Sequence, residues 1–155
     1  MQPLFLENYT SILKSLHGGL GMISLAALGF GVYLIVRRRD IDWSSGLKSS
    51  LVGVWSYLAI FVLGLLIYPV FRIKVRAEYF DLKLPWLTGL FEIKEYISAI
   101  GLFIALILLG YFYFLKVEES EKPVKQSFIN LIFILFLITL FQAIVGIVLG
   151  MYKSI

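Results

Sequence analysis

Residues 68–96 read YPVFRIKVRAEYFDLKLPWLTGLFEIKEY, the only long segment of the chain that is neither a purely apolar run nor a short turn. Basic and acidic residues are mixed in it: Arg72, Lys74, Arg76, Lys83 and Lys94 against Glu78, Asp81, Glu92 and Glu95. The rest of the 155-residue chain is close to lipid-soluble, because 60% of all residues are hydrophobic and soluble domains stay near roughly 45–50%. We therefore expect a membrane protein organised around this polar segment.

Uncharged apolar runs lie on both sides of the polar segment. Each is close to or above the roughly 20 residues that a helix needs to cross the hydrocarbon, and helix is the open-chain structure that satisfies its own backbone in lipid. We predict an all-α fold, a single integral membrane domain over residues 1–155. It is a four-transmembrane-helix bundle with an interfacial amphipathic segment between helices 2 and 3, and the spans cover residues 16–36, 49–71, 97–115 and 127–152.

The connection after the first run, residues 37–48, is short and polar. We expect a break in the helix there, caused by Asp40, Asp42, Ser44, Ser45 and Gly46.

Basic residues divide about equally between the two membrane faces, so their number does not set the orientation. Arg37-Arg38-Arg39 directly follows the first run, and the first span usually dominates topology. We therefore predict that both termini and the polar segment lie outside, in the periplasm for a bacterial inner-membrane protein.

Polar and apolar residues alternate from Phe71 to Glu78, which is a strand pattern, but a lone strand has no ladder partner here. The same residues also fit a helix of about 100° per residue. An apolar stripe then contains Phe71, Val75, Tyr79 and Leu82, and a basic stripe contains Arg72, Arg76 and Lys83. We predict that the second helix continues past Pro69 as a kinked interfacial helix and ends at Leu84-Pro85.

Charged residues at the start of the third span form the candidate site. Glu92 and Glu95 lie in its first turns, and Arg72 and Arg76 lie on the same side of the membrane. We predict a charge network of these four residues that pins the polar segment over the mouth of the bundle. It is a candidate ion or lipid site, and the alternative is a salt-bridged helix start.

His17 is the only histidine in the chain. A haem b in a helical bundle normally needs two axial ligands, so His17 would need a partner such as Met151 at the same membrane edge. Without cysteine, thiolate metal sites and covalent c-type haem are excluded. We expect no metal and no cofactor, with a His17–Met151 pair as the remaining possibility for haem b.

Two pairs of small residues are spaced four apart, Ala27 with Gly31 and Gly146 with Gly150. Such pairs let helix backbones approach closely. We expect packing inside this bundle, and a dimer face is the alternative.

No phosphate-binding loop, metal-ligand cluster or nucleophile with a neighbouring base occurs in the sequence. We therefore expect a non-catalytic subunit or accessory protein of a larger membrane assembly, such as one in energy metabolism. The alternatives are a small proton-coupled transporter using Glu92 and Glu95, and a redox membrane anchor for haem or quinone. Expected partners are the lipid bilayer and other membrane subunits or a second copy. Nucleic acid is excluded because the basic residues lie at the ends of apolar runs.

Around Tyr68-Pro69, Arg72, Arg76 and Leu90-Phe91-Glu92-Ile93-Lys94-Glu95, the chain resembles an uncharacterised family of bacterial four-span integral membrane proteins. The resemblance covers the central third of the chain and implies no activity. His17 before a glycine-rich first span is also loosely similar to small cytochrome b-type membrane anchors, but the second histidine ligand of those anchors is missing here.

Overall fold

A computed structural model describes residues 6–37, 40–117 and 119–152, and the regular structure in these ranges is helical, with no strand. Four helices in the described ranges are long and apolar enough to cross a membrane, so the predicted all-α four-helix architecture is confirmed. The protein is an integral membrane protein. These candidate spans are Glu7–Val36, Trp43–Lys83, Pro85–Tyr113 and Lys122–Tyr152.

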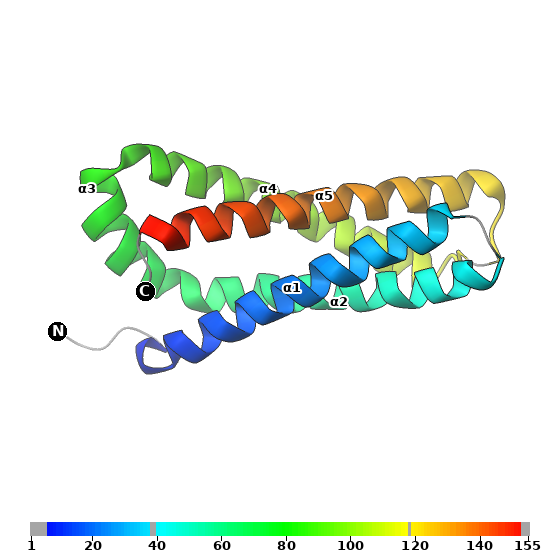
Figure 1. The fold of residues 1–155 in the computed structure, drawn as a ribbon, viewed down its shortest axis with the longest axis horizontal. Coiled ribbons are helices and arrows are strands. Elements are labelled where there is room, and N and C mark those ends of the chain that lie inside the picture. The colour runs from blue at the N-terminus through cyan, green and yellow to red at the C-terminus, as the bar shows by residue number, and fades with distance from the viewer. Residues whose placement is uncertain (1–5, 38–39, 118, 153–155) are drawn as a thin grey trace.

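The long helices run side by side along the molecule, and the polar segment closes one end of it (Figure 1). The start of α1 and the end of α5 lie at that same end, which we call the capped end. In chain order the elements are the 3₁₀ turn η1 (Glu7–Tyr9), α1 (Thr10–Val36), α2 (Asp40–Phe71), the π-helix η2 (Arg72–Phe80), α3 (Asp81–Lys83), α4 (Pro85–Tyr113) and α5 (Lys122–Tyr152).

Within the predicted connection, residues 37–48, α1 has ended at Val36 and α2 begins at Asp40, so the prediction that Ser44, Ser45 and Gly46 break the helix is wrong. Gly46 instead allows close packing against α1. A Cβ atom at Gly46 would lie 2.7 Å from Cγ1 of Ile35 and 3.2 Å from the carbonyl oxygen of Gly31. The small residue therefore serves helix contact, which outweighs its low helix propensity.

The seam between α1 and α2 is built from small residues along its length. Ser24 Oγ donates a hydrogen bond of 2.9 Å to the Gly53 carbonyl, and Ser49 Oγ donates one of 2.8 Å to the Ala27 carbonyl. A Cβ atom at Gly31 would lie 3.1 Å from the Gly46 carbonyl oxygen. Hydroxyl-to-carbonyl bonds and close backbones are how helices associate in lipid.

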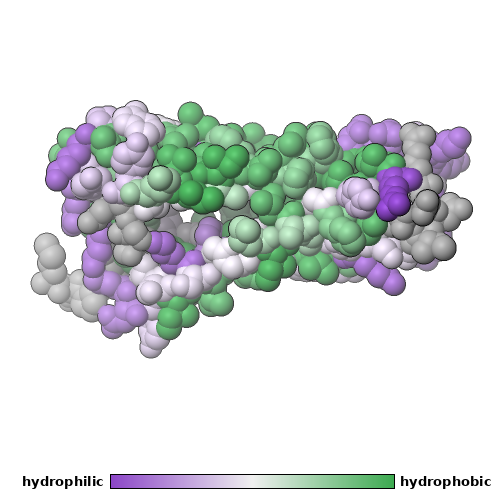
Figure 2. All heavy atoms as spheres, viewed as in Figure 1, coloured by the Kyte–Doolittle hydropathy of each residue, from purple (hydrophilic) through white to green (hydrophobic). Residues whose placement is uncertain are grey.

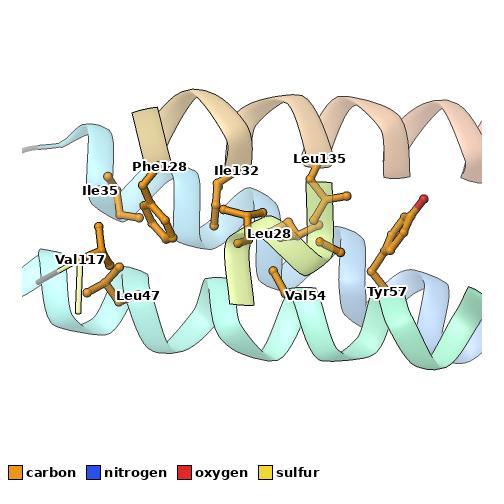
Figure 3. Packing of buried hydrophobic residues seen from close by; sticks show 11 residues of the cluster. Leu28, Ile35, Leu47, Val54, Tyr57, Val117, Phe128, Ile132 and Leu135 are labelled. Atoms are coloured by element: carbon orange, nitrogen blue, oxygen red, sulfur yellow. The ribbon is translucent and has the colours of Figure 1, made fainter. Parts of the chain in front are cut away.

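Buried apolar residues form two separate clusters. The main core joins all four long helices away from the capped end, and Figure 3 shows its side chains pointing toward one another. It contains Leu28, Ile35, Leu47, Val54, Tyr57, Ala105, Leu108, Val117, Phe128, Ile132 and Leu135. The cap core packs η2 against the start of α4 and the end of α5, and it contains Val75, Phe80, Leu87, Phe91, Val145 and Leu149.

Beyond Pro69, α2 continues as a helix into η2, as predicted, but with a different period. Val70, Val75 and Phe80 are 1%, 0% and 0% exposed and are spaced by five residues. That spacing matches the i→i−5 hydrogen bonds of a π-helix, such as the bond from the Asp81 N–H to the Arg76 carbonyl. The predicted apolar stripe is therefore wrong at Leu82, which is 75% exposed.

Candidate functional site

The segment that closes the capped end is held by an ion pair. Nη2 of Arg76 on η2 lies 2.6 Å from Oε1 of Glu92 on α4. Nε of the same guanidinium lies 3.7 Å from Oδ1 of Asp81. The side chains of Arg76 and Glu92 are 23% and 45% exposed, so the pair is partly screened by solvent.

Local structure brings these groups together. Pro85 occupies the first turn of α4, and Leu84 precedes it outside helical geometry, with φ −142° and ψ 63°. The chain reverses at this point. Across the turn, Thr88 Oγ1 donates a hydrogen bond of 2.6 Å to Oδ1 of Asp81. Asp81 therefore binds both sides of the turn, a role that the sequence analysis missed.

The other two residues of the predicted network lie nearby without a direct contact. Glu95 is half-buried and within electrostatic range of Arg76 and Arg72. Arg72 is exposed, and no ion pair joins it to Glu95 or Glu92 in the described part of the chain. The structure thus joins Arg76 to Glu92 directly and places Arg72 and Glu95 around that pair. The role of the four as an ion or lipid site stays a prediction.

A second ion pair ties η2 to the N-terminal turn. The Lys74 ammonium binds the Glu7 carboxylate of η1. The sequence analysis had no signal for this contact because the two residues are separated by 67 positions. Together the two pairs connect η2 to elements at both edges of the capped end.

His17 faces α2. Its Nδ1 lies 3.1 Å from the Ile60 carbonyl oxygen, and a carbonyl only accepts, so Nδ1–H is the donor. The ring also lies beside Gly64, where a Cβ atom would be 3.4 Å from its Cε1. Met151 on α5 is 79% exposed. No hydrogen bond or ring contact in the described ranges links the two side chains, and the His17–Met151 ligand pair stays a prediction.

Within the described residues no group of three or more His, Asp or Glu side chains could hold a metal ion. No protein-family model, curated protein or solved structure matches this chain. Function is therefore inferred from the geometry alone. The capped end offers a mixed-charge cluster that holds a polar segment in place.

Proposed function

We propose that the chain is a non-catalytic integral membrane subunit or accessory protein of a larger membrane assembly. The observation that carries the proposal is the contrast between inward and outward glycines. Gly31, Gly46 and Gly53 have neighbours so close that an added Cβ atom would clash. Cβ atoms at Gly146 and Gly150 would meet nothing within 4 Å, as is also true of five other glycines, and these two are spaced four apart on α5.

Gly146 and Gly150 lie on an exposed face of α5. Their spacing of four residues repeats the spacing that lets helix backbones approach in lipid. Inside the α1–α2 seam this chain uses small residues for such an approach. The outward pair supports a contact of the same kind with a helix of another chain.

Aromatic residues at the end of α4 give partial support. Tyr113 and Phe114 are 56% and 87% exposed. Tyr111 and Phe112, the two aromatic residues just before them, pack onto Phe128 of the main core, with ring centroids 5.9 and 5.2 Å away. The outward aromatic surface is therefore smaller than the sequence suggests.

Native mass spectrometry after extraction in a mild detergent tests the proposal. We expect a species heavier than the 17.7 kDa chain that contains at least one different protein. Gly150→Leu should reduce co-purification of that protein. Ile144→Leu, at an exposed position elsewhere on α5, is the matched control and should not. A lone chain, or a homodimer with no other protein, would contradict the proposal.

A proton-coupled transporter remains the second candidate, and Glu95 is the observation in its favour. Glu92 is engaged by Arg76, whereas Glu95 is half-buried without a direct ion pair in the described residues. Membrane carboxyls of this kind are candidates for proton transfer. Flux in proteoliposomes that Glu95→Gln abolishes would favour this candidate over the first. The haem version of the redox-anchor alternative predicts a Soret band in the purified protein.

A further inference from the structure

A layer without buried residues separates the main core from the cap core. No residue is buried at positions 11–23 of α1, 58–69 of α2, 92–100 of α4 or 140–144 of α5. Helices packed around a continuous core bury a residue on nearly every turn. Figure 2 shows the molecule hollowed near the capped end, with hydrophilic atoms within the hollow. The bundle is therefore open between its two cores.

Lys94 is half-buried within this layer. Neighbouring long helices are α1–α2, α2–α4, α4–α5 and α5–α1, so α1 and α4 are diagonal to each other. Lys94 on α4 nevertheless interacts electrostatically with His17 on α1. This half-buried lysine on α4 therefore lies within electrostatic range of the diagonal helix α1.

The Lys94 ammonium makes no hydrogen bond or ion pair among the described residues. Glu95, the next residue, lies within electrostatic range of both Arg76 and Lys94. A cation withdrawn from bulk water is costly unless a counter-charge accompanies it. Among the described residues, the layer thus contains a positive charge with no direct ion pair.

Other polar groups of the layer are fixed in position. Because His17 donates from Nδ1 to Ile60, the Nε2 atom of the neutral ring is an acceptor. Gln142 Nε2 donates a hydrogen bond of 2.8 Å to the Lys94 carbonyl oxygen and so links α5 to α4. Its amide oxygen can still accept. Beside Lys94, these two groups are neutral hydrogen-bonding partners, and the same layer positions also contain Lys14, Glu92 and Glu95.

The depth of the layer corresponds to the head-group boundary. Lys94 lies just before the apolar run 97–115, and His17 lies at the start of the run 16–36. A lipid phosphate lies at the edge of the hydrocarbon, and basic pockets between membrane helices bind anionic head groups. The hollow is open on the face shown in Figure 2, which gives an acyl chain a route to the bilayer.

We propose that the hollow between the main core and the cap core binds the phosphate group of an anionic lipid, with Lys94 as its charge partner. The proposal does not depend on the assembly proposed above. A free phosphate ion shares the recognised chemistry but lacks the acyl chains that would enter the open side.

Lipid binding by the full chain in a neutral detergent tests this site, with dioleoyl-phosphatidylglycerol, dioleoyl-phosphatidylcholine and inorganic phosphate as probes. We expect phosphatidylglycerol to bind at least tenfold more tightly than either other probe. The choline of phosphatidylcholine offsets the charge of its phosphate, and inorganic phosphate has no acyl chains to enter the open side. Lys94→Met should weaken phosphatidylglycerol binding by roughly tenfold. Lys94→Arg should retain most of it.

Lys83→Met is the matched control. It removes the same charge at the capped end from an exposed side chain that stacks on Tyr79, outside the layer. Equal binding of phosphatidylglycerol by wild type and Lys94→Met would overturn the proposal, as would inorganic phosphate binding as tightly as the lipid. If Lys94→Met does not fold, a photoreactive phosphatidylglycerol must label wild-type residues 92–100. Labelling confined to other regions would equally overturn it.

Discussion

Arg76 and Glu92 are 16 residues apart in sequence, and their side chains meet at 2.6 Å across the turn at Leu84-Pro85. The pair joins η2 to α4, while Lys74 joins η2 to Glu7 in the N-terminal turn. The π-helical period also buries Val75 and Phe80 of η2. Ion pairs and apolar packing therefore both hold η2 in place. The capped end is therefore an ordered tertiary structure, stabilised by contacts between residues that are far apart in sequence.

Charge reversal at Arg76 should destabilise the capped end. Arg76→Glu would place a third carboxylate beside Asp81 and Glu92, and we expect the free energy of unfolding to fall by about 1–2 kcal/mol, since a partly exposed pair is worth up to about 1 kcal/mol and repulsion adds to its loss. The double change Arg76→Glu with Glu92→Arg should recover part of the loss. Denaturant unfolding in detergent measures both. Lys83→Glu reverses the charge of an exposed side chain and is the control. If it lowers the free energy of unfolding as much as Arg76→Glu does, the loss does not come from the Arg76–Glu92 contact.

The α1–α2 seam should be intolerant of added volume. Gly31→Ala would bring a methyl group against Ser50 and the Gly46 carbonyl, and we expect a loss of about 1–3 kcal/mol, as for other overpacked interiors. Gly110→Ala on α4, where a Cβ atom meets nothing within 4 Å, should leave stability unchanged or slightly raised. Thermal unfolding of the two variants side by side provides the measurement. Equal thermal stability of Gly31→Ala and Gly110→Ala would contradict close packing of α1 against α2 at Gly31.

Tyr57 and Gly101 should behave as a coupled pair. Tyr57 lies against α4, and its hydroxyl donates a hydrogen bond of 3.1 Å to the Ser98 carbonyl oxygen. A Cβ atom at Gly101 would lie 2.7 Å from Cζ of Tyr57. Gly101→Ala should therefore cost about 1–3 kcal/mol. Combining it with Tyr57→Leu, which removes the ring, should cost less than the sum of the two single changes. Strict additivity in the double-mutant cycle would argue against this contact.

Topology reporters test the predicted orientation. The start of α1 and the end of α5 lie with η2 at the capped end, so one experiment orients all three. A reporter after Ile155 should read as external, and one inserted near Ser45 should read as cytoplasmic. The reverse pattern would mean that the basic residues of η2, rather than Arg37-Arg38-Arg39, set the topology.

The long helices could be predicted from sequence because apolar runs of this length leave the backbone no other partner in lipid. The role of Gly46 could not be predicted from sequence. A glycine that breaks a helix and a glycine that lets a neighbouring helix approach closely look the same in sequence. The five-residue spacing of Val70, Val75 and Phe80 is visible in the sequence, but nothing local distinguishes a π-helical period from an α-helical one. The order of the predicted spans was enough to predict that Arg76 and Glu92 lie at the same end of the bundle.

The remaining contacts depend on tertiary placement. Lys74 pairs with Glu7 only because the turn η1 folds beside η2. Lys94 comes within electrostatic range of His17 only because α1 and α4 pack in the same bundle. Neither relationship has a local sequence signal.

Site-specific crosslinking in native membranes tests the proposed assembly most directly. The chain has no cysteine, so Gly150→Cys introduces a single thiol that can carry a photoreactive maleimide. We predict an adduct with a different membrane protein from position 150, and none or much less from the control Ile144→Cys. Crosslinking to lipid alone at both positions, or to the same proteins in equal yield from both, would contradict the account.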